Sequence, residues 1–176
     1  MKRMLSLSLS ALLILAALVG CGSQDAGTPS RTPEEATEAY QTAIESARDD
    51  ELNEAVPVVT STEDDTASLV LPLIGITDEN TDAFAVAISP MNIKAYGVAA
   101  ILPAEGKSEE VLEGVNAFVE QQKQNFQQYL MDQYDIASAA RVETLEDGTI
   151  LMVMCEGQDD VFTAIKTAVE AGKELT

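Results

Sequence analysis

The sequence predicts an α+β fold in which two antiparallel hairpins form a four-stranded sheet, packed by a long helix and a C-terminal helix. Two observations support this expectation. Two pairs of short apolar runs are each joined by turn residues, as in β-hairpins. Each pair is followed by a longer segment whose apolar residues recur at three- and four-residue spacing, as on one face of a helix. Burying both hairpins under the two helices gives one layered domain.

Before this domain, we expect residues 21–66 to form a tether that contains one helix near 33–48. Thr32 and Glu35 have the spacing of a capping box, and Pro33 suits the first helical position. The apolar stripe of this helix consists of Ala36, Tyr40, Ala43 and Ile44. A stripe this thin predicts only loose packing on the main domain. The acidic, Thr-rich stretch that follows the helix has little to bury and is typical of a linker.

The folded domain is expected to span residues 67–176 and to begin with the first hairpin. Residues 68–75 are apolar but interrupted by a proline, which predicts a short helical or irregular piece. In residues 83–88, bulky apolar side chains alternate with alanines, which predicts a strand with one bulky face. Residues 89–92 have turn composition, and 93–102 are expected to form the return strand.

The long helix is expected to start at Ser108 as its N-cap and to run to about residue 131. Its apolar residues recur with helical spacing, and charged residues occupy the opposite face. Residues 132–135 mark a break or bend after this helix.

The second hairpin is expected from strands at 140–145 and 149–155, which flank the turn Asp147-Gly148. The second of these strands is apolar on both faces, so we expect it to be central and covered on both sides. The last helix opens at Asp159 and is expected to end near Gly172.

Charge and composition exclude several classes of function. The chain has 30 acidic and 10 basic residues, a formal net charge of −20, and such a surface repels nucleic acid. Histidine is absent, which removes the commonest general base and the commonest metal ligand. We therefore expect no nucleic-acid partner, no cofactor and no metal site. Catalytic residues are also not expected, because no nucleophile lies in a recognisable setting.

One acidic segment resembles the start of a calcium-binding loop. Asp78, Asn80 and Asp82 have its one-three-five oxygen spacing. The match then fails, because Ala83 stands where glycine is needed and Ser89 where a bidentate glutamate belongs. A plain acidic loop is the favoured interpretation.

The N-terminal residues resemble the signal of bacterial lipoprotein precursors. After a basic start, the apolar run of residues 4–19 is shorter than the roughly 20 residues that a membrane-spanning helix needs. The run ends on the lipobox-like residues Leu18, Val19, Gly20 and Cys21. The resemblance implies that residues 1–20 are a signal peptide and that Cys21 is lipidated. This places the mature chain on the extracytoplasmic face of the cell membrane. An ordinary secretory signal that happens to end in Gly-Cys is the alternative.

Lipidation of Cys21 would leave Cys155 without a partner in the chain. Cys155 ends an apolar run that is typical of a buried strand. We therefore expect it to be an inert core thiol rather than a reactive one.

Three further stretches carry a family resemblance: Ala87 to Asn92, Gln128 to Tyr134, and Val153 to Glu156. They resemble a family of short bacterial surface lipoproteins known only as a domain of unknown function, numbered four-three-five-eight. The resemblance implies a lipid-anchored extracytoplasmic protein of Gram-positive bacteria. It brings no known activity, substrate or catalytic residue.

These stretches contain the residues that we single out as a candidate interaction surface: Met91, Asn92, Tyr129, Asp132, Gln133 and Tyr134. They form one surface if the bend after the long helix folds beneath the first hairpin turn. The alternative is structural, with the two tyrosines capping the core and Asp132 capping the next helical turn.

The expected function is thus a non-enzymatic, lipid-anchored binding or interaction module for a protein or cell-wall partner. The alternative is a small carboxylate-based hydrolase or a cation-binding lipoprotein. Catalysis or cation binding predicts carboxylates that converge in a concavity, whereas a partner surface predicts an exposed patch with Met91, Tyr129 or Tyr134.

Overall fold

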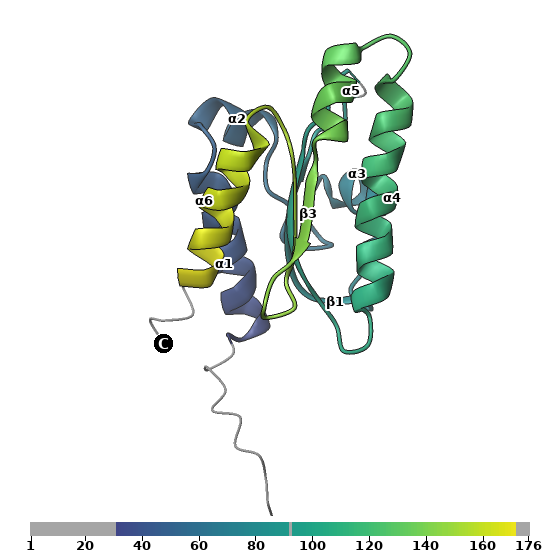
Figure 1. Ribbon diagram of the computed structural model, residues 1–176. Coiled ribbons are helices and arrows are strands. Elements are labelled where there is room, and N and C mark those ends of the chain that lie inside the picture. Colours follow the sequence, from purple (N-terminus) through teal and green to yellow (C-terminus); the bar gives the residue numbers. More distant parts are fainter. Residues whose placement is uncertain (1–30, 92, 172–176) are drawn as a thin grey trace, which may run out of the picture.

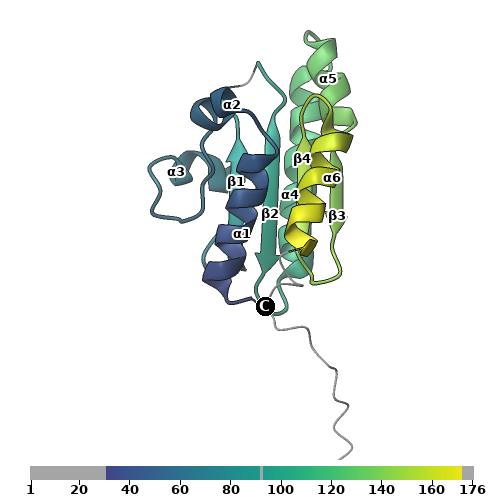
Figure 2. The ribbon, with the colours of Figure 1, turned by 90° about the vertical axis from the view of Figure 1, so that its left-hand side faces the viewer.

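The computed structural model describes residues 31–91 and 93–171. Its centre is a four-stranded antiparallel sheet in the order β1-β2-β4-β3, with helices on both faces (Figures 1 and 2). The strands are β1 (Thr81–Ile88), β2 (Gly97–Pro103), β3 (Arg141–Thr144) and β4 (Ile150–Met154). The α+β class and the sheet of two hairpins are confirmed. The hairpins join through β2 and β4, which makes β4 central, as its apolar sequence predicts.

Two helical layers enclose the sheet (Figure 1). One face is covered by α1 (Pro33–Ser46) and α6 (Gln158–Ala171). The other face is covered by α4 (Ser108–Phe126) and α5 (Met131–Ser138). The shorter elements are α2 (Asp50–Ala55), α3 (Ala67–Val70) and the 3-10 turn η1 (Leu71–Leu73). The predicted packing of the sheet by a long helix and a C-terminal helix is therefore confirmed. The long helix is α4, and the C-terminal helix α6 lies on the opposite face.

Alternation along β1 divides the interior into two cores. Phe84, Val86 and Ile88 belong to the core beneath α4, whereas the alanines between them belong to the core beneath α1 and α6. Successive side chains of a strand point to opposite faces, so the period-two pattern of the sequence decides this division. The alanine face lets α1 lie close to the strand.

The expectation of a loosely packed helix in a tether is wrong. Ala36, Tyr40, Ala43 and Ile44 of α1 are all buried, and they pack on the alanine side of β1 and against α6. The Tyr40 hydroxyl shares a 2.7 Å hydrogen bond with Thr149 Oγ1 inside this core. This thin stripe suffices because the strand face opposite consists of alanines, which leave room for Tyr40 and Ile44. The folded unit therefore includes α1.

The stretch after α1 also belongs to the folded unit rather than to a linker. Val59 exchanges two backbone hydrogen bonds with Val86, at 2.7 and 2.9 Å, and its side chain is buried. The two bonds place this short segment along the outer edge of β1. The helix α2 precedes it and contributes no buried residue.

Element ends differ from expectation at three places, and the break expected at residues 132–135 is wrong because these residues lie within α5. β2 starts at Gly97 rather than at residue 93, and residues 93–96 form part of the connecting loop. The long helix ends at Phe126 rather than near 131, so that Phe126 and Ala137 of α5 both reach the same core. Ser108 is its first residue and not its cap, because Lys107 occupies the cap position.

Two glycines allow close approaches that a side chain would prevent. A Cβ atom on Gly114 of α4 would lie 2.5 Å from the carbonyl oxygen of Ile74. A Cβ atom on Gly97 would lie 3.0 Å from the ring of Phe118. The predicted turn at Asp147-Gly148 is confirmed, with Gly148 at a φ of 88°.

Among the described residues, no helix is long and apolar enough to cross a membrane. The signal-peptide residues, Cys21 and Gly172 lie outside the described residues, so the predictions about them stay predictions.

Candidate functional site

The loop between β1 and β2 meets the α4–α5 junction, as the interaction-surface hypothesis required. The Ala95 backbone N–H donates a 2.8 Å hydrogen bond to Gln133 Oε1 of α5. Gln133 Nε2 in turn donates to Asp132 at 2.9 Å, and this bond lowers the pKa of the Asp132 carboxyl. The contact fixes the loop against the start of α5. Asn92 lies outside the described residues.

The remaining predicted residues divide into exposed and packed ones. Met91 and Tyr129 are exposed, with 55% and 73% of their surface accessible. Tyr134 is half-buried and packs against the core beneath α4. Tyr134 and Gln133 therefore support the site, while Met91 and Tyr129 face outward.

Two exposed residues at this end were missed by the sequence analysis. Ile93 is 65% exposed and Met131 is 57% exposed. Residue 93 had been assigned to a strand and 131 to a helix end, where apolar residues are expected to be buried. A strand starting at Gly97 instead leaves Ile93 in the loop. The helix break before Met131 similarly turns that side chain outward.

Four exposed apolar residues lie in the two segments that the Ala95–Gln133 hydrogen bond joins, and we call them the tip: Met91, Ile93, Tyr129 and Met131. They are four of the six large hydrophobic residues that are exposed in the described part of the chain. The tip lies at the end of the molecule where α4 passes into α5 (Figure 1). α1 begins at the opposite end of the molecule (Figure 1).

The base of the β1–β2 loop is anchored in the core beneath α1 and α6. Tyr96 is buried, and burial raises the pKa of its phenol. Arg48 Nη1 donates to the Tyr96 hydroxyl at 3.3 Å and to the Val56 carbonyl at 3.0 Å. These bonds tie the loop to the end of α1, so the tip is presented by a held loop.

Cys155 is confirmed as a buried residue near the end of β4. Burial is the main cause that raises its thiol pKa to about 11. The thiolate, which is the nucleophilic form, is therefore scarce at neutral pH.

The acidic segment at 78–82 is used for structure. The Asn80 side chain accepts from the Thr77 N–H and donates to the Gly75 carbonyl and to Glu110. The Asp78 carboxylate accepts from the Thr62 hydroxyl. Across residues 31–91 and 93–171, no three or more His, Cys, Asp or Glu residues are grouped to hold a metal ion.

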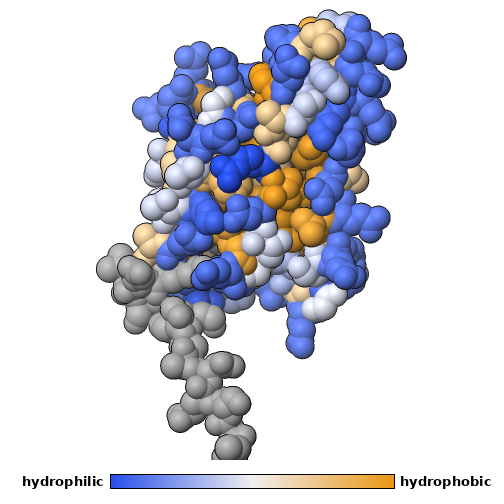
Figure 3. All heavy atoms as spheres, viewed as in Figure 1, coloured by the Kyte–Doolittle hydropathy of each residue, from blue (hydrophilic) through white to orange (hydrophobic). Residues whose placement is uncertain are grey.

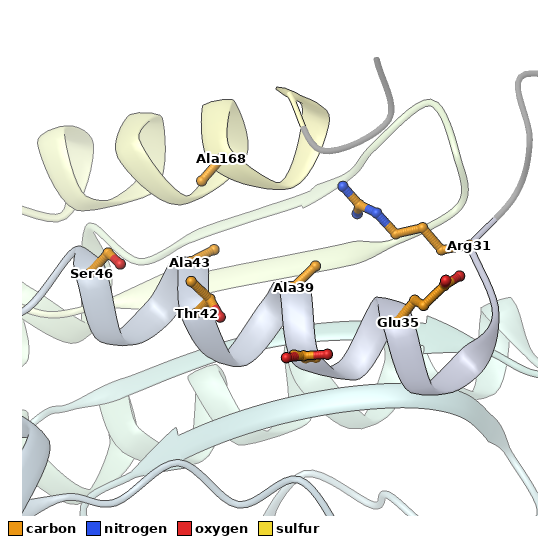
Figure 4. A pocket seen from close by; sticks show the side chains of 8 residues that line it. Arg31, Glu35, Ala39, Thr42, Ala43, Ser46 and Ala168 are labelled. Carbon is orange, nitrogen blue, oxygen red and sulfur yellow. The ribbon is translucent and has the colours of Figure 1, made fainter. Parts of the chain in front are cut away.

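A shallow groove between α1 and α6 has a volume of about 430 Å³ (Figure 4). Small residues of α1 line its floor, and Ala168 faces them from α6. Arg31 lies at one end, where its guanidinium donates to the Val169 carbonyl at 3.0 Å. A second, smaller hollow of about 210 Å³ is lined by hydroxyl groups and two aspartates near Thr60.

The model of one protein family, described as a domain of unknown function (DUF4358), matches residues 54–155. The chain belongs to this family. The DUF4358 match spans the four strands with α3, α4 and α5, and therefore includes the tip. Helices α1 and α6 lie outside the matched residues. No curated protein and no solved structure matches the chain.

Proposed function

We propose that this DUF4358 protein is a lipid-anchored, extracytoplasmic binding module without catalytic activity. Its tip, formed by Met91, Ile93, Tyr129 and Met131, would bind a protein or cell-wall partner. The observation that carries the proposal is the concentration of exposed apolar side chains at one end of an otherwise acidic molecule. Aromatic residues and methionines are enriched where proteins bind partners.

The geometry of the tip supports a role in binding. Single exposed hydrophobic residues are ordinary, but a group from two separate segments at one end is not. The Gln133–Ala95 hydrogen bond holds the two segments together before any partner arrives. A pre-arranged surface loses less conformational entropy on binding.

The position of the tip also agrees with lipidation of Cys21. The domain starts near Thr32, at the end opposite the tip (Figure 1). A lipid on Cys21 would thus attach the membrane to one end and leave the tip free. The lipobox-like residues Leu18, Val19 and Gly20 provide the motif for this modification.

The chemistry of the described residues gives little support to the hydrolase or cation-binding alternative. The Cys155 thiol is buried and has a raised pKa. The Asn80 amide bonds to neighbouring backbone and side-chain groups, and one Asp78 oxygen accepts from the Thr62 hydroxyl. The hollow near Thr60 is open to solvent, and so is a neighbouring one of about 350 Å³ between α1 and Asp82.

Site-specific photocrosslinking of the full chain on its native cell tests the proposal. A photoreactive phenylalanine analogue replaces Tyr129 in one variant and Leu69 in a control. Leu69 is also exposed, at 61%, but lies on α3. We expect a discrete adduct from position 129 that is lost when Ile93→Asp and Met131→Asp are added. The same adducts from both positions, or none from position 129, would contradict binding at the tip.

Lipid anchoring is tested separately with Cys21→Ser. This variant is expected to leave the membrane fraction, whereas the photocrosslinking variant at 129 stays in it. Retention of Cys21→Ser in the membrane fraction at the wild-type level would contradict anchoring through this residue.

A further inference from the structure

The two edge strands of the sheet differ in whether another segment pairs with their outer side. The outer edge of β1 is covered by the segment around Val59, which forms two backbone hydrogen bonds to Val86. β3 is the other edge strand, and within the described residues it has β4 as its single neighbour in the sheet. Its four residues are half-buried or exposed. An open edge strand presents unpaired backbone groups that can pair with another strand.

The register of the hairpin identifies those groups. The Leu145 N–H donates to the Thr149 carbonyl at 2.8 Å. Hydrogen-bonded pairs alternate along an antiparallel ladder, so Glu143 bonds to Leu151 and Arg141 to Val153. The N–H and C=O groups of Val142 and Thr144 consequently point away from β4 and toward the open edge.

The charged side chains of β3 do not block this edge. Glu143 forms an ion pair with Lys166 of α6, on one face of the sheet. Arg141 pairs with Asp159 at 3.3 Å, and its guanidinium lies 3.8 Å from the ring centre of Phe162. Edge charges usually discourage pairing, but these are held against α6. They also place two basic residues beside one edge of a chain whose net charge is −20.

We propose that β3 pairs antiparallel with β3 of a second copy of this chain, about a two-fold axis at Val142. In this register Val142 faces Val142, and the two residues exchange both backbone hydrogen bonds. Arg141 of each copy then lies opposite Glu143 of the other. Opposite charges at facing positions stabilise a strand pair, whereas like charges destabilise it. Shifting the register by two residues would place Glu143 opposite Glu143, so the charge pattern selects the first arrangement.

The surface around β3 fits such an interface. Hydrophobic side chains gather along this edge, between the hydrophilic outer faces of α4 and α6 (Figure 3). Val142 itself is half-buried and packs against the core on the α4 side. Pairing would extend one sheet through both copies and remove this apolar strip from water. The edge is distinct from the tip, so the inference stands without the proposed partner binding.

Cysteine crosslinking of the full chain in its native membrane tests the pairing and its register. Facing residues of a hydrogen-bonded pair have Cα atoms about 5.5 Å apart, within the range that a disulfide bridges. Val142→Cys should therefore form a disulfide-linked dimer on mild oxidation. Thr144→Cys is the matched control on the same edge. In the proposed register the two residues at 144 lie roughly 13 Å apart, too far for a disulfide. The wild-type chain is the second control, because any disulfide-linked dimer that it forms must involve Cys21 or Cys155.

A dimer from Val142→Cys that exceeds both controls several-fold would support the proposal. Adding Arg141→Glu to that variant should reduce the dimer several-fold, because Glu then faces Glu143. Adding Arg141→Glu together with Glu143→Arg should restore it, since opposite charges face each other again. Equal dimer from positions 142 and 144, no dimer from 142, or indifference to the charge reversals would overturn the proposal.

Discussion

The hydrogen bond between Tyr40 and Thr149 gives the sharpest test of how α1 is packed. The two oxygen atoms are 2.7 Å apart, and both residues are at most 1% exposed. Tyr40→Phe removes one hydroxyl and leaves the other buried without this partner. An unsatisfied buried hydroxyl costs about 1–3 kcal/mol, which is a large share of the roughly 5–15 kcal/mol that stabilises a typical domain. We expect Tyr40→Phe to lower the free energy of unfolding by that amount.

A double-mutant cycle separates this bond from general packing. Thr149→Val leaves the Tyr40 hydroxyl unpaired and should cost about 1–3 kcal/mol as well. The double variant has no unpaired hydroxyl, so its loss should be clearly smaller than the sum of the single losses. Urea unfolding of each variant measures these free energies. Tyr129→Phe is the control, because Tyr129 is 73% exposed and its hydroxyl is hydrated; no change is expected.

The pH dependence of the free energy of unfolding tests the burial of Tyr40 independently. Burial is the main cause that raises the pKa of the Tyr40 phenol above its ordinary value of 10.0. The folded state therefore keeps this proton at pH values where the unfolded state loses it. The resulting stability is fully present below pH 10 and falls as the pH rises through the folded pKa. Tyr40→Phe should lose less stability above pH 10 than the wild type does. Additive single effects, or an unchanged Tyr40→Phe, would refute the conclusion that α1 is part of the core.

Three further predictions use other parts of the structure. Gly114→Ala should destabilise the protein by about 1–3 kcal/mol in urea unfolding, because its Cβ atom would lie 2.5 Å from the Ile74 carbonyl oxygen. Asn116→Ala, an exposed change on the same helix, should not destabilise it, and equal effects would argue against the close contact. The Cys155 thiol, with a pKa of about 11, should resist alkylation by iodoacetamide at pH 8 until urea unfolds the chain. Mass spectrometry measures the alkylation in the Cys21→Ser variant, in which Cys155 is the one remaining cysteine. Prompt alkylation of the folded form would contradict its burial. Millimolar calcium should leave the melting temperature unchanged, because Asn80 spends its side-chain oxygen and amide on neighbouring groups; a rise would favour the cation-binding alternative.

Local sequence patterns were sufficient for most of the sheet. The alternation of bulky residues with alanine in residues 83–88 predicted the strand and its one bulky face, which packs in the core beneath α4. Asp147-Gly148 predicted the second hairpin, because a tight turn needs a residue that accepts a positive φ. These features depend on neighbours within a few residues, so they can be read without the rest of the chain.

The candidate site was only partly predictable. Met91 and Tyr129 were selected through the family-like stretches, but Ile93 and Met131 were not. Apolar residues beside predicted strands and helices are expected to be buried, and their exposure depends on where those elements end. The end of α4 at Phe126 is set by the fit of Phe126 and Ala137 into a common core. No local pattern around residue 131 carries that information.

By itself, the sequence determined the α+β class, the two hairpins, the acidic surface and the lipobox-like motif at Cys21, because each depends on composition or on short-range periodicity. The tertiary structure alone decided that α1 is packed in the core, since its thin stripe becomes sufficient only against the alanine face of β1. It also decided which sheet edge is covered by Val59 and which is left open at β3. Those outcomes depend on surfaces that are distant in sequence and become complementary only once the chain has folded.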